Sequence, residues 1–453
     1  MLSNSFSLRV LIALFPALLS SVVAFGKDGD DHLRLTYISA SSQKMEQVIG
    51  DRDWQSAFNG ILRNTASQTV TRADVLGTDH GVSFEHNGSL VFLFGDTIGA
   101  AAEYFPTWVN FTSDYRWQAH DPIAWSDTRR ADDPLVINFL KDSLGNPLYV
   151  NPIYPDGYVL PMNADDVPNA GISLNGHIYI IVNAGADVTD KTDAHAHAYS
   201  VLTTFDPISQ SFAAGRTISR TDQGGHFVFD TLHEYSRECG ADEDSVLMFG
   251  EGDFRKSDIY LSITPKNGFR DGVGTKYFAG CDHGHPIWKN HEIDAKPVVV
   301  DNPRGSIPPD HPGVGELTVT YCHELGLWLM TYDGGRVTPE DTGAYFTYAK
   351  HPWGPWSTPQ LIFNASRDNG LGNFIRAYDA TSGVGAGPEG PTINLQNNPP
   401  ATTPGGDFGP HIIERFTKVE GSMLTIYYLM ATWNPYTVIK MKSEFRINRS
   451  DDH

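Results

Sequence analysis

The sequence predicts an all-β protein and, within that class, a five-bladed β-propeller. Short runs rich in β-branched and aromatic residues recur along the chain, separated by glycine, proline, asparagine and aspartate, as is typical of strands and tight turns. The chain has 43 glycines and is 11% aromatic, whereas only residues 45–64 show helical spacing. A β-sandwich with a second domain is the alternative that these observations leave open.

Five strand pairs favour the propeller. They are expected at residues 81–85 with 90–94, 170–174 with 178–182, 226–235 with 245–249, 317–321 with 328–332, and 411–416 with 424–430. A third strand-like segment follows each pair, at residues 122–126, 199–205, 257–261, 344–348 and 437–441. A repeated hairpin with a further strand is what each blade requires. The uneven spacing of the units predicts long loops on one face.

Composition divides the chain into three regions. Arg9 is the only charged residue before an apolar run at residues 10–25, and the polar residues after it fit the end of a secretory signal peptide. This run is short and contains Pro16, which argues against a membrane span. We expect a signal peptide at residues 1–25, an N-terminal segment with a short helix at 26–73 packing on the propeller, and the propeller at 74–448. An uncleaved signal anchor is the alternative to secretion.

The charge balance bears on the partners. The chain has 54 acidic and 33 basic residues, a formal net charge of −21. Such a surface repels nucleic acid and anionic membranes, so neither is expected as a partner, and a monomer is expected. Four sequons begin at Asn87, Asn110, Asn364 and Asn448 and fit N-glycosylation in a eukaryotic host.

The cysteines and histidines give no strong signal for a disulfide framework or a metal. Three cysteines are too few for a disulfide scaffold; a Cys239–Cys281 bridge is the pairing considered, and Cys322 is expected to be a buried thiol. Histidines two residues apart, at 195 and 197 and at 283 and 285, have a spacing that can bind a metal. No further ligand set accompanies them, so neither a metal nor a cofactor is expected.

Acidic residues near the starts of the inner strands are the candidates for catalysis. In a propeller these starts converge on a central funnel although they are far apart in sequence. Asp79 precedes the first inner strand and Glu316 the fourth; Asp165, Asp166 and Asp407 precede others, while Asp96 and Glu251 follow second strands. Glycosidic hydrolysis commonly uses two carboxylic acids. We expect Asp79 to be the base or nucleophile and Glu316 the general acid.

Five further residues are expected to contact a substrate: Asp96, His226, Glu251, Arg255 and Trp433. Asp96 fits equally well a turn in which its carboxylate accepts hydrogen bonds from nearby backbone N–H groups. Glu251 with Arg255 also fits an ion pair. Aromatic residues in the loops could stack on sugar rings; these are Tyr104, Phe105, Trp108, Tyr115, Trp117, Trp288, Trp433 and Tyr436. Together they favour a polysaccharide as the substrate.

An ordered set of motifs resembles the domain of unknown function family 4185. The motifs are LGTDHG at residues 76–81, FLFGDT at 92–97, FGEGDFR at 249–255, GELTV at 315–319, WGPWS at 353–357, FGPHIIERF at 408–416 and YYLMATWNPY at 427–436. The resemblance implies a five-bladed propeller, and some members of this family are glycoside hydrolases of family 183 that act within the D-arabinan of mycobacterial cell walls. By position, Asp79 looks like the catalytic aspartate of blade one. Glu251 departs from the family pattern, which puts the substrate in doubt.

The first hypothesis is a secreted glycoside hydrolase that cleaves a furanose polysaccharide, with D-arabinan as the preferred substrate and endo-cleavage as the mode. The second is an enzyme on the same scaffold that acts on L-arabinan, fructan or another plant polymer. The third is a propeller that binds glycans without cleaving them. Reducing ends released from a panel of polysaccharides would separate the three.

Overall fold

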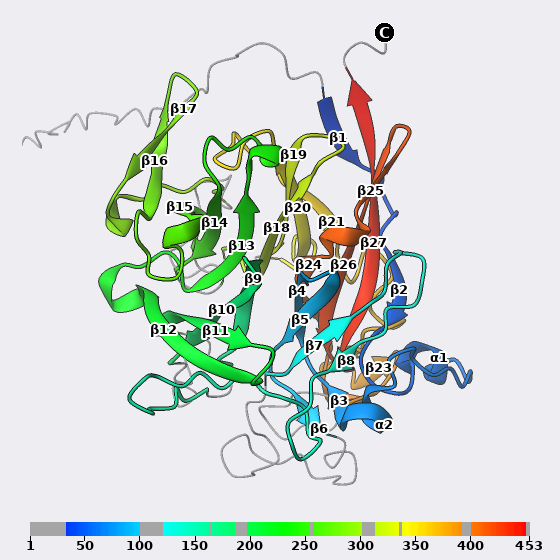
Figure 1. The fold of residues 1–453 in the computed structure, drawn as a ribbon. Coiled ribbons are helices and arrows are strands. Elements are labelled where there is room, and N and C mark those ends of the chain that lie inside the picture. Colours follow the sequence, from blue (N-terminus) through cyan, green and yellow to red (C-terminus); the bar gives the residue numbers. More distant parts are fainter. Residues whose placement is uncertain are drawn as a thin grey trace, which may run out of the picture. The chain divides into compact units, whose positions relative to one another are not determined.

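Five antiparallel sheets surround a common centre, which confirms the predicted five-bladed β-propeller (Figure 1). The computed structural model describes residues 33–99, 121–162, 165–185, 197–252, 255, 257–300, 313–334, 338–391 and 400–449. The expected signal peptide at residues 1–25, the aromatic residues between 104 and 117, and His195 lie outside this described part. Within it, no helix has both the length and the apolar character needed to cross a membrane.

The first four blades each follow one another along the chain, from an inner strand outward. Blade 1 consists of β4 (His80–His86), β5 (Ser89–Phe94), β7 (Ile123–Ser126) and β8 (Asn138–Phe139). Blade 2 consists of β9 (Pro168–Leu174), β10 (His177–Ala184), β11 (Tyr199–Asp206) and β12 (Ser211–Arg220). Blade 3 consists of β13 (Phe229–Tyr235), β14 (Ser245–Glu251), β15 (Tyr260–Pro265), β16 (Lys276–Asp282) and β17 (His285–Lys289). Blade 4 consists of β18 (Leu317–Cys322), β19 (Leu327–Gly334), β20 (Gly343–Ala349) and β21 (Gln360–Phe363).

The fifth blade takes strands from both ends of the described chain. Its inner strands are β24 (Asp407–Ile412), β26 (Met423–Trp433) and β27 (Tyr436–Arg449), and the short β25 (Lys418–Glu420) also pairs with β26. Its outer strands are β1 (Leu33–Tyr37) and β2 (Gln43–Gln47), both antiparallel to β27. The N-terminal segment therefore contributes to the fifth sheet itself.

The inner strands form a closed ring. In order, β4 contacts β9, β9 contacts β13, β13 contacts β18, β18 contacts β24, and β24 contacts β4. All five begin at the same end of the propeller, which we call the head end. Residues at the head end therefore come from every blade.

Three expected boundaries differ from those observed. The helical spacing at residues 45–64 corresponds only to α1 (Trp54–Phe58), because residues before it pair with β27 as β2. The strand expected from residue 226 begins at Phe229, since the N–H of His226 donates to the carboxylate of Glu292 instead of joining the ladder. The strand expected at 411–416 is β24, and residues after it turn into the 3-10 segment η7 (Glu414–Phe416).

Short elements decorate the blades. They are α2 (Thr69–Ala73), β3 (Val75–Gly77) paired with β6 (Ile98–Gly99), β22 (Ala377–Asp379) paired with β23 (Val384–Ala386), and the 3-10 turns η2 (Thr221–Gln223), η3 (Arg237–Cys239), η4 (Lys266–Gly268), η5 (Glu292–Asp294) and η6 (Pro400–Thr402).

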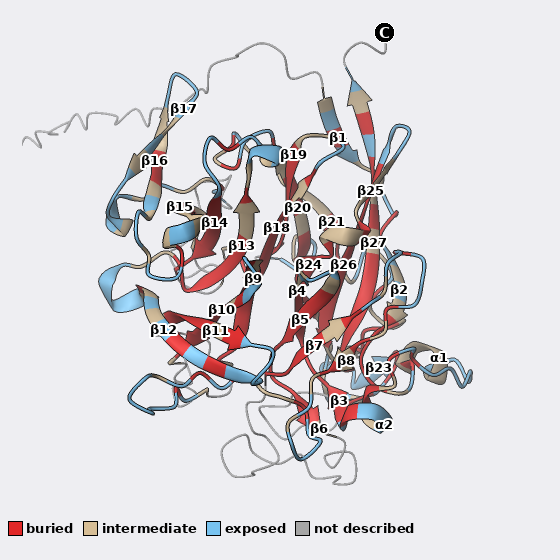
Figure 2. Ribbon diagram, in the orientation of Figure 1, coloured by how far each residue is buried: buried red, intermediate tan, exposed pale blue. Residues whose placement is uncertain are grey.

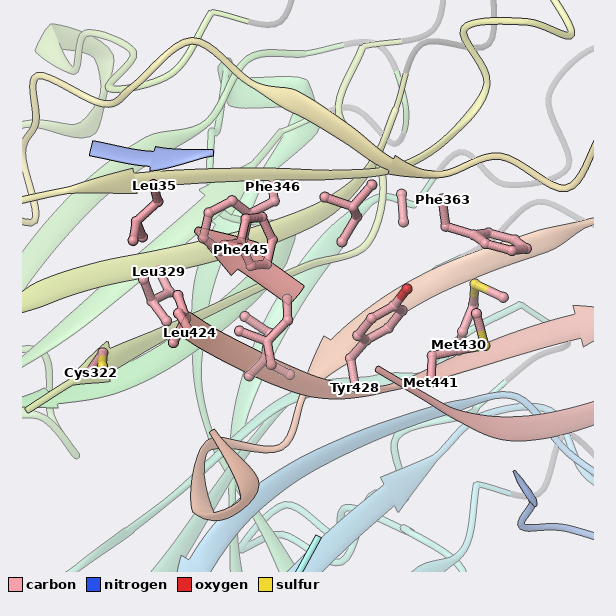
Figure 3. Packing of buried hydrophobic residues seen from close by; sticks show 14 of the residues in the cluster. Leu35, Cys322, Leu329, Phe346, Phe363, Leu424, Tyr428, Met430, Met441 and Phe445 are labelled. Atoms are coloured by element: carbon pink, nitrogen blue, oxygen red, sulfur yellow. The ribbon is translucent and has the colours of Figure 1, made fainter. Parts of the chain in front are cut away.

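The core lies between the faces of neighbouring blades, where the central strands are buried (Figure 2). Between blades 4 and 5, Phe346 packs on Phe445 with ring centroids 4.1 Å apart, and Tyr428 lies in the same cluster (Figure 3). Cys322 belongs to this cluster, so the expected buried thiol is confirmed. The Cys239–Cys281 bridge is not formed, and all three cysteines are free thiols. Hydrophobic burial between blades, rather than a disulfide, holds the described fold together.

Candidate active site

The two expected catalytic acids both lie at the head end. Asp79 directly precedes β4 in blade 1, and Glu316 directly precedes β18 in blade 4. Only 6% of Asp79 and 7% of Glu316 is exposed. The charge of Glu316 contributes to raising the pKa of Asp79, so the two carboxyls interact electrostatically. Closure of the ring thus brings together two acids from non-adjacent blades.

Glycine at position 95 makes room for the Asp79 carboxyl. The chain turns sharply after Asp79, with φ of +58° at His80 and +102° at Gly81. The N–H of Gly95, just after β5, donates to the backbone oxygen of Asp79 at 3.2 Å. A Cβ atom at Gly95 would lie 2.7 Å from Cδ2 of His80 and closer still to Oδ1 of Asp79. The glycine of the FLFGDT motif is therefore required by the close approach of a catalytic candidate.

The environment of Asp79 favours its protonated form. Burial is the largest effect and raises the pKa of Asp79 to about 6, and the negative charges of Glu316 and Asp165 act in the same direction. His80, whose Nε2 lies 3.7 Å from Oδ1 of Asp79, and the hydroxyl of Tyr436 oppose the rise. A carboxyl with such a pKa can hold a proton at mildly acidic pH and release it to a leaving group.

Glu316 lies against a cation, Arg255. One guanidinium nitrogen of Arg255 lies 3.1 Å from Oε1 of Glu316 and 3.5 Å from Oδ2 of Asp333. Hydrogen bonds between the backbones of Glu316 and Asp333 (3.1 Å) and of Gly315 and Asp333 (2.7 Å) fix the start of β18. Arg255 was expected to contact substrate; the structure places it against Glu316, where its charge stabilises the carboxylate.

A second set of acids lies behind Asp79. Burial and the charges of Asp165, Asp79 and Asp121 raise the pKa of Asp96 well above its usual value. Asp121, which the sequence analysis did not select, is fully buried, and in the described part of the chain neither of its carboxylate oxygens has a hydrogen-bond partner. Burial and the charges of Asp79 and Asp166 raise its pKa well above its usual value. Its position just before the strand at 123–126 was the signal that could have identified it.

The other expected substrate contacts lie in different surroundings. The imidazole of His226 stacks on Tyr260, with centroids 3.8 Å apart, and burial lowers its pKa. Glu251 ends β14 and is completely buried, so a sugar would not reach it in this conformation. Trp433 is partly exposed and packs on Phe408 with centroids 5.7 Å apart. Of these three, Trp433 is best placed to offer a ring face.

Two histidines that the sequence analysis did not select join the site to blade 5. The Nδ1 atom of His80 lies 3.4 Å from Nε2 of His411, and Nδ1 of His411 lies 2.9 Å from the hydroxyl of Thr318. All three side chains are buried. His411 belongs to the FGPHIIERF motif, and its place on an inner strand was the signal that could have found it.

The described residues contain no group of three or more histidine, cysteine or acidic side chains arranged to hold a metal ion. His197 lies with its Nε2 3.4 Å from Oδ1 of Asp166, whereas the side chain of His283 is 93% exposed and His285 is exposed as well. Of the histidines that had the spacing of metal ligands, the three that the structure describes thus lie in two different settings.

Comparisons with solved structures find distant likenesses. A family 43 glycoside hydrolase, YxiA, from Bacillus licheniformis is 13% identical over 83% of this chain and 72% of that chain, with a TM-score of 0.37. A GH43_1 enzyme from Xanthomonas citri complexed with xylose is 11% identical over 82% and 88%, with a TM-score of 0.38. Endo-1,5-alpha-L-arabinanase from Thermotoga petrophila RKU-1 is 12% identical over 82% and 71%, with a TM-score of 0.39. At these TM-scores, the propeller assignment rests on the sheets described above.

No curated protein matches the chain. A family model does: the model described as a domain of unknown function, DUF4185, matches residues 64–442. This range includes all strands of blades 1 to 4 and most of blade 5, together with Asp79, Glu316 and His411. The chain therefore belongs to the DUF4185 family.

Proposed function

We propose that this chain is a glycoside hydrolase of furanose polysaccharides that cleaves D-arabinan within the polymer. One observation carries the proposal: two buried carboxyls from opposite blades interact at the head end, and their surroundings differ. Burial raises the pKa of Asp79 to about 6, while Arg255 lies 3.1 Å from Glu316. Glycosidic hydrolysis requires two carboxyls, one that protonates the leaving oxygen and one that acts as a carboxylate.

These surroundings favour a division of roles opposite to the one expected from the sequence. Asp79, which keeps a proton up to about pH 6, is the general acid and donates that proton to the glycosidic oxygen as the bond to the anomeric carbon breaks. Glu316, paired with Arg255, acts as a carboxylate on the anomeric carbon or on the attacking water. The anomeric configuration of the first product, read by NMR, distinguishes these two routes for Glu316.

Substrate contacts complete the proposal. Trp433, which is partly exposed, is the proposed stacking contact for a sugar ring, and the buried Asp96 is the proposed hydrogen-bonding contact. The choice of D-arabinan rests on the resemblance of the motifs to family 183 glycoside hydrolases. We propose that the enzyme acts outside the cell, because the apolar run at residues 10–25 fits a cleaved signal.

The test is release of oligosaccharides from mycobacterial arabinogalactan by the wild type and three variants. Asp79→Asn and Glu316→Gln should each lower the rate by at least about 1,000-fold, since each removes one of two essential groups. Glu243→Gln alters an exposed acid and should keep wild-type activity. Oligosaccharides from the wild type, with none from the two site variants, support the proposal. Binding of arabinan without release of reducing ends would reject it in favour of a glycan-binding propeller.

A further inference from the structure

Three buried polar side chains from three blades form a continuous line at the head end. They are His80 on β4 of blade 1, His411 on β24 of blade 5 and Thr318 on β18 of blade 4. The separations are 3.7 Å from Asp79 Oδ1 to His80 Nε2, 3.4 Å from His80 Nδ1 to His411 Nε2, and 2.9 Å from His411 Nδ1 to the hydroxyl of Thr318. The line therefore runs from Asp79 to a residue two positions after Glu316.

His411 is a neutral imidazole near neutral pH. Burial, followed by the adjacent His80, lowers the pKa of His411 to about 3, although the charge of Glu316 acts in the opposite direction. A neutral imidazole has one N–H donor and one bare nitrogen acceptor. His411 must therefore donate one of its two hydrogen bonds and accept the other, so the donors along the line point either toward Asp79 or away from it.

The needs of Asp79 select the sense. Its Oδ1 atom is buried and accepts no hydrogen bond from any residue that the structure describes, and His80 Nε2 faces it. The other groups that act on Asp79 are the hydroxyl of Tyr436 and the carboxyls of Glu316 and Asp165, and Asp96 and Asp121 lie close enough to be affected by its charge. Only His80 can supply an N–H to Oδ1 from this line.

We propose that Thr318, His411 and His80 form a directed hydrogen-bond relay that orients the Asp79 carboxyl. This inference deepens the proposed function and rests on the role of Asp79 in it. The hydroxyl of Thr318 donates to Nδ1 of His411, Nε2–H of His411 donates to Nδ1 of His80, and Nε2–H of His80 points to Oδ1 of Asp79. The 3.7 Å gap shortens when substrate excludes water from the site, as catalytic hydrogen bonds commonly do. Thr318, His411 and His80 are positioning residues because each acts through Asp79.

The relay makes an unusual prediction for position 318. Thr318→Val keeps the shape and β-branching that a strand favours but removes the hydroxyl, whereas Thr318→Ser keeps the hydroxyl and loses the methyl group. A role in packing alone would make serine the more damaging change. The relay makes valine the more damaging one, with kcat lowered about 3- to 10-fold, KM unchanged and the basic limb of the pH profile moved up by about half to one unit. Wild-type kinetics in Thr318→Val, or a larger loss in Thr318→Ser, would overturn the relay.

A second measurement is independent of catalysis. Protein labelled with ¹⁵N only in its histidines gives the tautomer of each imidazole by NMR, and His411→Gln identifies the signals of His411. The relay predicts a neutral His411 with its proton on Nε2 between pH 5 and 8, unchanged in Thr318→Ser and mixed in Thr318→Val. A proton on Nδ1, or a cationic ring at pH 5, would refute the relay. If the wild type released no products, the proposed function would fail and this measurement alone would decide the relay.

Discussion

Replacing Gly95 with alanine should displace the Asp79 carboxyl without changing the carboxyl group itself. Gly95→Ala adds one methyl group at a site whose φ does not exclude a side chain, so the effect is steric. The new Cβ would lie 2.7 Å from His80 Cδ2, 2.8 Å from Val167 Cγ1 and closer still to Asp79 Oδ1, all inside normal contact. Val167, His80 and Asp79 are all buried, so the added methyl group must displace at least one of them, and Oδ1 of Asp79 is the atom it approaches most closely.

Two magnitudes follow from this displacement. Overpacking of a tight site should lower the free energy of unfolding by about 1–3 kcal/mol, measured by urea denaturation. A shift of about 1 Å in a catalytic carboxyl should lower kcat/KM by about 100-fold, measured by reducing ends released from arabinogalactan. The matched control is Gly99→Ala on β6, where the nearest atoms lie 3.5 Å away, an ordinary contact. Wild-type kcat/KM in Gly95→Ala, with a folded protein, would refute the assignment of Asp79.

Three further predictions concern protons and charge. Asp121 keeps in the folded state a proton that the unfolded chain loses above about pH 4, so the stability of the wild type should fall as pH rises. In urea denaturation between pH 4 and 7, the free energy of unfolding of Asp121→Asn should rise relative to that of the wild type by up to about 1.4 kcal/mol per pH unit, and equal pH slopes for the two proteins would contradict this. Burial alone would lower the pKa of His233, but the interaction with Glu414, 3.1 Å away, more than offsets burial and the pKa is raised. The pair therefore stabilises the fold below about pH 6.5, and this stabilisation is lost as pH rises through the higher folded-state pKa. Glu414→Gln should lower the Tm more at pH 5.5 than at pH 9, and the reverse order would be inconsistent with this linkage. Lys440 is buried, with its Nζ atom 2.5 Å from a carboxylate oxygen of Glu46. Glu46→Ala should lower the free energy of unfolding by about 3–5 kcal/mol because it leaves the Lys440 ammonium without its carboxylate partner, whereas a loss below about 0.5 kcal/mol would show that the pair is dispensable.

The blades could be predicted because each hairpin is local. The alternation at residues 81–94 or 317–332 identifies both strands and their turn without reference to the rest of the chain. Asp79 and Glu316 could also be selected, because a propeller places the starts of its inner strands together. The pairing of Arg255 with Glu316 could not, since it depends on how two loops from different blades meet.

The protonation states of Asp79 and Glu316 could not be predicted from the sequence for the same reason. Whether Asp79 or Glu316 holds the proton depends on burial and on charges from blades 1, 2 and 4, and the expected roles of the two acids were assigned without them. The positions of Asp121 before a strand and of His411 on an inner strand could have identified both residues, but their burial and their interactions depend on other blades and could not be predicted. The edge strands β1 and β2 escaped notice because their partner, β27, lies almost at the other end of the chain.

The shared fifth sheet has a consequence for biosynthesis. Leu33 pairs with Arg449, so one of the first strands to be made finds its partner only when the final strand has left the ribosome. Until β27 is made, β1 and β2 lack the strand with which they pair, and unpaired strands favour aggregation. A stop codon within β27 would leave the strands of the first four sheets complete but would remove the partner of β1, β2 and β26 in the fifth sheet. The fifth sheet therefore cannot be completed until synthesis has reached β27, whereas the strands of each of the first four sheets follow one another along the chain.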